Sequence, residues 1–176
     1  MNALSGARGR RSLHFRQQCR VAAAAAGALL AVVGAAAAET GEAALARHDY
    51  PRAAAIFRVE ATRGRARAQT YLGYLYSRGL GAPRDFALAA QWWRAAAEQG
   101  EPAAQFFLGL AYDRGQGAPQ DFVTAEVWLI LAAAEAPAQR REYWARIRDA
   151  VAGKLSLAEL REAQASAVAW RPTAGP

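Results

Sequence analysis

Apolar residues in the middle of the chain recur with the period of an α-helix. From residue 68 to residue 76 they follow intervals of four, three and one, and a second apolar run from residue 86 onward has related spacing. Residues at such intervals share one face of a helix. The pattern predicts two amphipathic helices, with buried faces made by Ala68, Leu72, Leu75 and Tyr76 on the first and by Phe86, Ala89, Ala90, Trp93, Ala96 and Ala97 on the second.

The same pattern returns after 36 residues. A shift of 36 positions places Leu72 on Leu108, Tyr76 on Tyr112 and Trp92 on Trp128. A shift in the other direction aligns a degenerate copy, in which Asp49-Tyr50 falls on Asp85-Phe86. Repetition of this length indicates an array of stacked helix pairs, each of which buries its apolar face against its neighbours.

Almost the same nine residues fill the corner between the two helices of each unit. They read RGLGAPRDF at 78–86 and RGQGAPQDF at 114–122. The glycines suit the left-handed backbone that ends a helix, the proline stops the helix, and Asp85 suits the N-cap of the next helix. A phosphate-binding glycine loop would follow a strand and carry a lysine, and a metal site would need a second carboxylate at ligand spacing. These segments are therefore interpreted as structural corners.

The repeated residues resemble the Sel-1-like repeat family, a relative of the tetratricopeptide repeats. The shared positions are Ala68-Gln69, Leu72-Gly73, Tyr76, Asp85-Phe86, Ala89, Trp92 and Ala96-Ala97, and each recurs 36 residues later. The resemblance covers residues 66–136 strongly and residues 40–65 as a degenerate unit. It implies an all-α fold, an α-solenoid of helix-turn-helix repeats. It also implies protein–protein interaction or scaffolding without catalysis.

The ends of the array have the features of caps. A terminal repeat has no neighbour to cover its apolar face, so an array needs a cap there. Trp144 and Val151 share one helical face, and Ser156 with Glu159 forms a capping box at the start of a last helix. The predicted layout is a signal peptide at 1–38, a degenerate first repeat at 39–65, repeats at 66–101 and 102–137, capping helices at 138–170 and a disordered tail at 171–176.

The N-terminal segment has the order of a secretory signal peptide. Five arginines in the first 20 residues precede an uncharged apolar run at 21–38, which ends in an Ala-x-Ala pattern. This order predicts cleavage after Ala38 and export, with the periplasm as the expected location. The alternative is an N-terminal membrane anchor, although a run made mostly of alanine is a weak spanning helix.

Cleavage would leave a mature chain without cysteine, because Cys19 is the only one. Activities suggested for the cysteine-rich exported branch of the family are therefore not carried over. Cleavage would also remove five of the seven excess positive charges and leave a net charge of +2. Positive and negative residues are interspersed along the remaining chain, so no nucleic-acid partner is expected.

Residues that suit catalysis are few. His48 stands beside Asp49, a pair that is more often a helix-end contact than a catalytic base, and none of the serines lies in a Gly-x-Ser-x-Gly motif. The sequence therefore predicts no catalytic residues, no cofactor and no metal site. An unrecognised enzyme, such as a hydrolase, is the remaining catalytic alternative.

One face of the first helices is a candidate binding surface. In a helix-pair solenoid these helices line the concave side, where positions outside the packing consensus carry specificity. Aromatic residues and arginines dominate protein interfaces, so a strip of them predicts a protein or peptide partner. The alternative is that the aromatic rings only pack between units. The candidate partner-binding residues are Arg67, Tyr71, Tyr74, Arg78, Phe107 and Arg114.

Together these features predict a non-catalytic protein–protein interaction or scaffold module of the cell envelope. The partner would bind on the concave face of the repeats. The alternative is a structural protein that associates with itself through an exposed terminal repeat face.

Overall fold

The computed structural model describes residues 39–173, and from Thr40 onward they belong to one compact unit. The predicted signal peptide, residues 1–38, lies outside the described residues. All regular structure in the described range is helical, which confirms the predicted all-α fold. In chain order the helices are α2 (Gly41–Ala46), α3 (Tyr50–Thr62), α4 (Ala66–Arg78), α5 (Phe86–Glu98), α6 (Pro102–Arg114), α7 (Phe122–Ala134), α8 (Arg141–Ala152) and α9 (Leu157–Ala169).

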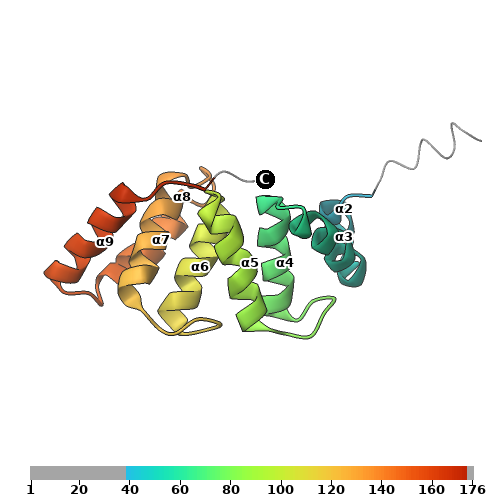
Figure 1. Ribbon diagram of the computed structural model, residues 1–176, viewed down its shortest axis with the longest axis horizontal. Helices are drawn as coiled ribbons and strands as arrows, with labels where there is room; N and C mark the ends of the chain where they lie inside the picture. The colour runs from blue at the N-terminus through green and yellow to red at the C-terminus, as the bar shows by residue number, and fades with distance from the viewer. Residues whose placement is uncertain (1–38, 174–176) are drawn as a thin grey trace, which may run out of the picture. The chain divides into compact units, whose positions relative to one another are not determined.

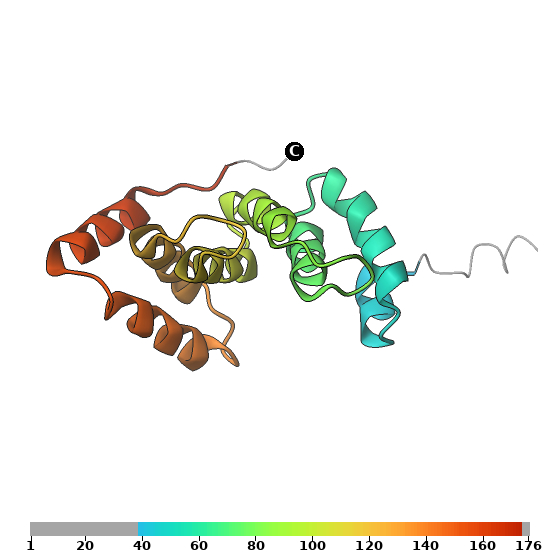
Figure 2. The ribbon, with the colours of Figure 1, turned by 90° about the horizontal axis from the view of Figure 1, so that it is seen from below.

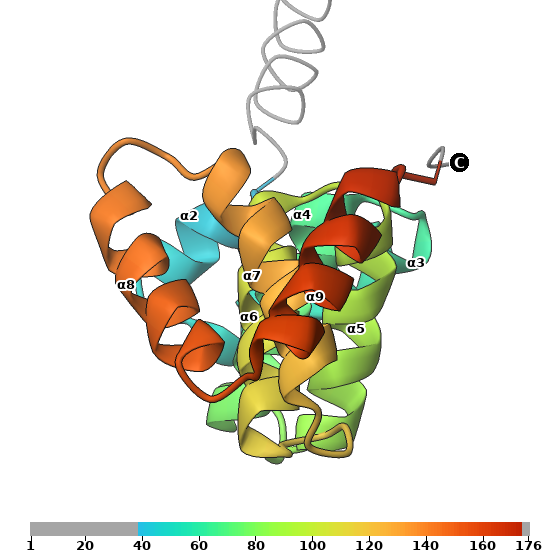
Figure 3. The same ribbon diagram turned by 90° about the vertical axis from the view of Figure 1, so that its left-hand side faces the viewer.

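From α2 to α8, each helix packs against the next in an antiparallel arrangement. The tightest pairs are α4 with α5 and α6 with α7, and the last helix, α9, returns to pack on α7 (Figure 1). A view along the row places α2 and α8 on one side and α3, α5 and α9 on the other (Figure 3). This arrangement is that of an α-solenoid built from helix pairs.

Aspartates begin the second helices, as the corner motif predicts. The Asp85 side chain accepts a hydrogen bond from the backbone N–H of Leu88 at 2.9 Å, and Asp121 does the same for Thr124 at 3.0 Å. Asp49 caps α3 in the degenerate unit by accepting from Arg52 at 3.3 Å. These bonds satisfy N–H groups that have no partner within the helix.

The corner glycines also let adjacent repeats stack. Gly79 and Gly115 end α4 and α6 in left-handed conformation, with φ of 70° and 63°. The second glycine of each corner touches the preceding unit: a Cβ added at Gly81 would overlap the backbone carbonyl of Tyr50, and one at Gly117 would overlap that of Phe86. The repeated glycines are therefore contact points between units as well as turns.

Two other repeated residues have equivalent contacts in both units. The buried Gln69 side chain donates to the Ala61 carbonyl oxygen at 3.2 Å, and Gln105 donates to that of Ala97 at 3.3 Å. Each bond ties a first helix to the carbonyl end of the preceding helix, where backbone acceptors lack helical partners. A Cβ at Gly73 would lie 2.6 Å from Trp93 Nε1 and 3.0 Å from the Ala89 carbonyl oxygen, so the glycine lets α4 and α5 approach closely.

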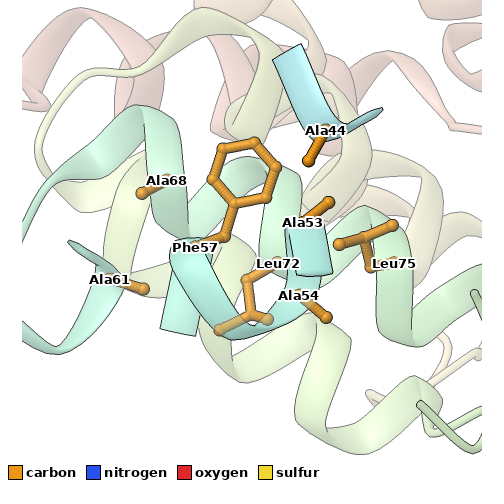
Figure 4. Close-up of a cluster of buried hydrophobic side chains, with 8 residues drawn as sticks. All are labelled: Ala44, Ala53, Ala54, Phe57, Ala61, Ala68, Leu72 and Leu75. Atoms are coloured by element: carbon orange, nitrogen blue, oxygen red, sulfur yellow. The ribbon is translucent and has the colours of Figure 1, made fainter. Parts of the chain in front are cut away.

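The degenerate first unit has a core of its own. Phe57 is surrounded by small and aliphatic side chains from α2, α3 and α4 (Figure 4). A Cβ at Gly41 would reach the Phe57 ring at about 2.4–2.7 Å. Short α2 can therefore lie against the ring only because it begins with glycine. The buried residues of this cluster are Ala44, Ala53, Ala54, Phe57, Ala61, Ala68, Leu72 and Leu75.

The first residues of the C-terminal segment predicted as a tail contact the end of α5. The backbone N–H and the hydroxyl of Thr173 both donate to the Glu98 carbonyl oxygen, at 2.7 and 3.0 Å. Trp170 lies edge-on to Trp128, with ring centroids 6.1 Å apart. Residues 171–173 are thus held against the end of α5, because they satisfy a free carbonyl of that helix. Residues 174–176 lie outside the described residues.

Candidate partner-binding groove

Two adjoining hollows follow α4 and α6. The larger has a volume of about 760 Å³ and the smaller about 390 Å³, and Tyr74 and Phe107 line both. We call the two hollows together the groove. All six residues predicted from the sequence line it. Arg67 and Tyr71 lie in the larger hollow, Arg78 and Arg114 in the smaller, and Tyr74 and Phe107 in both.

Helix geometry brings these side chains together. Arg67, Tyr71, Tyr74 and Arg78 follow one another at intervals of four, three and four along α4, so they share one face. Phe107 and Arg114 occupy the positions of Tyr71 and Arg78 in the next repeat, on α6. The stacking of the repeats then places the two faces side by side. Tyr74 and Phe107 approach across the boundary, with ring centroids 6.2 Å apart.

The aromatic rings of the groove also take part in packing. Tyr71 stacks on buried Phe57 at a centroid distance of 4.8 Å, and Phe107 stacks on buried Trp93 at 5.2 Å. Both rings are half-buried. The alternative expected from the sequence, packing between units, therefore describes one side of each ring, while the other side lines the groove. Truncation of Tyr71 or Phe107 to alanine would consequently alter stability together with any binding.

Several arginines are positioned by aromatic rings. The guanidinium of Arg78 lies 5.7 Å from the centroid of Tyr74, and that of Arg67 lies 5.8 Å from Tyr71. Arg67 also pairs with Glu42 at 3.3 Å. Such cation–π contacts restrict an exposed side chain without neutralising its charge. The groove therefore presents oriented positive groups beside apolar ring faces.

Other groove residues come from outside the two strong repeats, and sequence periodicity gave no sign of them. Leu45, His48 and Tyr50 from the degenerate unit border one end of the larger hollow, and Arg140 and Trp144 border the other end. Figure 2 shows α2 (blue) and α8 (orange) on the same side of the row, towards opposite ends, with α4 and α6 between them. Their part in the groove depends on how the end units fold over the repeats.

The histidine considered as a catalytic base has a different partner. His48 Nδ1 lies 2.8 Å from the hydroxyl of Tyr50, while Asp49 caps α3. His48 and Asp49 therefore contact different groups and do not form a hydrogen-bonded pair with each other. Within residues 39–173 no three His, Cys, Asp or Glu side chains are placed to hold a metal ion. No helix of this range is long and apolar enough to cross a membrane.

Among the described residues, Glu126 is the one acidic residue whose side chain is buried. It lies on α7 at the position that Ala90 occupies in the preceding repeat, and it is 4% exposed. Its Oε2 has no hydrogen-bond partner. Burial raises the pKa of Glu126 to about 7, against the opposing effect of Arg148 on α8 and with a smaller contribution from Asp149. A carboxyl in this setting is neutral when the solution is mildly acidic.

Glu126 is expected to make stability depend on pH. Its folded-state pKa is about 7 against an ordinary 4.5, so the unfolded chain ionises first and stability falls as pH rises between these values. The linked loss is on the order of 3 kcal/mol. In chemical denaturation, Glu126→Gln should match the wild type near pH 4.5 and exceed it near pH 8. A constant difference across that range would contradict the assignment.

The repeated corners, the glutamine bonds between units and the helix pairs define the class of this protein as an α-solenoid repeat protein. The family model of the Sel1 repeat matches residues 66–101 and 102–136. The chain is a Sel1 repeat protein. Sel1 repeats are generally used for protein–protein interaction, and the comparisons detect no enzyme family.

Two solved structures are similar to the chain. One is a protective antigen present in uropathogenic Escherichia coli strains that displays an SLR fold: it is 32% identical, with a TM-score of 0.63, over 68% of this chain and 25% of that chain. The other is a Sel1 repeat protein from Oxalobacter formigenes: it is 35% identical, with a TM-score of 0.53, over 56% of this chain and 39% of that chain. The chain thus spans less than half the length of either. No curated protein matches it.

Proposed function

We propose that this protein is an exported, non-catalytic module of the cell envelope that binds a protein partner in the groove along α4 and α6. The observation that carries the proposal is the gathering of aromatic rings and arginines from two repeats into adjoining hollows. The general use of Sel1 repeats for protein interaction supports it. Half-buried rings with one open side and oriented arginines are typical anchors of protein interfaces.

The groove suits a chain segment better than a flat protein surface. The two hollows adjoin through Tyr74 and Phe107 and are bordered by α2 and α8 at the ends of the larger one. Extended peptide advances by about 3.3 Å per residue, so a few residues suffice to pass from one hollow to the other. Alternate side chains would then meet the rings of α4 and α6.

Purification of the full chain with a C-terminal tag from the periplasmic fraction, followed by mass spectrometry, is expected to recover a specific partner. Tyr74→Ala should weaken binding of that partner by about 2 kcal/mol, a typical loss for an interface anchor. Tyr143→Ala is the matched control, because Tyr143 is 49% exposed and lies outside the groove lining. Equal binding by both variants would contradict the proposal. A mass that rises with protein concentration, without a partner, would favour self-association.

The same preparation tests export. N-terminal sequencing of the recovered protein should begin at or near Glu39, because the Ala-x-Ala pattern ends at Ala38. Recovery of a chain that begins at Met1 or Asn2 from the membrane fraction would favour the anchor instead.

A further inference from the structure

The two hollows of the groove differ in charge. The smaller hollow is lined by Arg78, Arg84 and Arg114, and no carboxylate of the described residues lines it. The larger hollow contains Glu101 beside Arg67 and Arg140, and Arg67 is already paired with Glu42. Positive charge without a counter-charge is therefore concentrated at the smaller hollow.

The arginines of the smaller hollow are held without being neutralised. Arg78 lies over Tyr74, and Arg84 lies over Phe86 at 5.6 Å. The ion pairs of the described chain include none of the three arginines. Arg78 and Arg114 also stand in the last turns of α4 and α6, where a positive charge favours the helix itself.

That helix-end role does not account for Arg84. It lies in the corner loop, outside any helix, and its counterpart in the next repeat is Gln120. The chain from residue 39 onward has a net charge of only +2, so three unpaired arginines in one hollow are not a property of the whole surface. They form a local site that complements negative charge.

The larger hollow is mainly apolar, in contrast to the positively charged smaller hollow. Tyr71 and Phe107 present ring faces there, and Leu45, Leu80 and Pro102 add aliphatic surface. Its charged groups include both signs. An apolar side chain would gain most in this hollow, because its burial removes apolar area from water on several sides.

We propose that the partner segment is an acidic peptide with an apolar anchor, whose Asp or Glu side chains lie against Arg78, Arg84 and Arg114 while an aromatic or aliphatic side chain fills the larger hollow. This rests on the proposed function, since it assigns the chemistry of the segment that occupies the groove. Nucleic acid fits less well. Its phosphates repeat evenly along the strand, whereas Glu101 lines the larger hollow and Glu42 neutralises Arg67 there.

Selection of short random peptides displayed on phage, with the full chain as bait, tests this chemistry. The peptides enriched by the selection, the winning peptides, are expected to combine Asp or Glu with an apolar residue at a fixed spacing. Arg84→Gln introduces the residue of the next repeat and should weaken a winning peptide about threefold, while Arg84→Glu with Arg114→Glu should weaken it at least tenfold, in line with charge pairs of this exposure. Gln120→Glu supplies a matched corner substitution outside the groove lining and should have no such effect.

The outcomes separate the two proposals. Winners without acidic residues that still lose affinity in Tyr74→Ala would overturn the inference and leave the proposed function in place. No peptide above background would count against both. Tighter binding of a polyuridylate probe than of any winning peptide would overturn the inference in favour of nucleic acid. Unchanged circular dichroism and melting of the arginine variants shows that lost affinity does not come from unfolding.

Discussion

Gly117→Ala is expected to lower the free energy of unfolding by about 3–5 kcal/mol, a large change for a single methyl group. Gly117 has a φ of 80°, and a Cβ there would overlap the carbonyl oxygen of Phe86 in the preceding unit. The obstacle is backbone at the start of α5, so it cannot turn aside as a flexible side chain would. The corner of one repeat would have to move away from its neighbour.

The first glycine of the same corner is the control for this substitution. Gly115 has a similar φ of 63°, but an added Cβ would come no closer than 3.3 Å to Gln120, at its Cβ, and 3.5 Å at its backbone nitrogen. Gly115→Ala should therefore cost about 1–2 kcal/mol, the penalty of the left-handed backbone alone. Denaturant unfolding of both variants measures the difference. Equal losses would show that Gly117 is a turn residue and not a contact between units.

Trp144→Ala is expected to cost about 3–5 kcal/mol, the usual loss for a large buried aromatic residue. Trp144 is 2% exposed and stacks on Phe106, with ring centroids 4.7 Å apart and planes inclined by 10°. This contact holds the capping helix α8 against α6, so its loss would leave α8 held mainly by its packing on α7.

The neighbouring residue provides the comparison for Trp144. Tyr143 is 49% exposed on the same helix, and Tyr143→Ala should cost less than about 1 kcal/mol. Thermal and denaturant melts of the two variants measure this contrast. A melt of Trp144→Ala that matches the wild type would contradict the anchoring role of the cap.

Much of the fold follows from local chemistry, which is why the sequence predicted it. Helix period, the aspartate N-caps at Asp85 and Asp121 and the left-handed glycines at Gly79 and Gly115 depend on residues a few positions apart. The capping box of Ser156 and Glu159 is formed as predicted. Because the sequence repeats after 36 residues, each local prediction for one unit applies to the next unit as well.

Contacts between distant segments were harder to predict. Trp128 is half-buried beside Trp170, a residue that the repeat period does not reach. The bond from Thr173 to Glu98 joins residues 75 positions apart, and nothing local indicates it. The burial of Glu126 was not predicted either: it occupies the position of buried Ala90, but carboxylates are rarely buried without a partner, so the residue type gives no sign of burial.

Part of the candidate site was predictable because it depends on local helical spacing. Its six predicted residues lie on two strongly periodic helices, so helical spacing alone places them on one face. The borders of the groove come from the degenerate unit and from the cap, including Tyr50 and Arg140. Arg84 was missed because it stands in the corner motif, whose residues have evident structural tasks.

Site-specific photocrosslinking in cells tests most directly whether the groove is the partner-binding face. A photoreactive residue at Leu110, which lines the smaller hollow, should form a crosslink to the same protein that co-purifies with the full chain. The same residue at Val59, which is 52% exposed on α3 and outside the groove lining, should form none. A crosslink to the partner from Val59 and none from Leu110 would contradict binding in the groove.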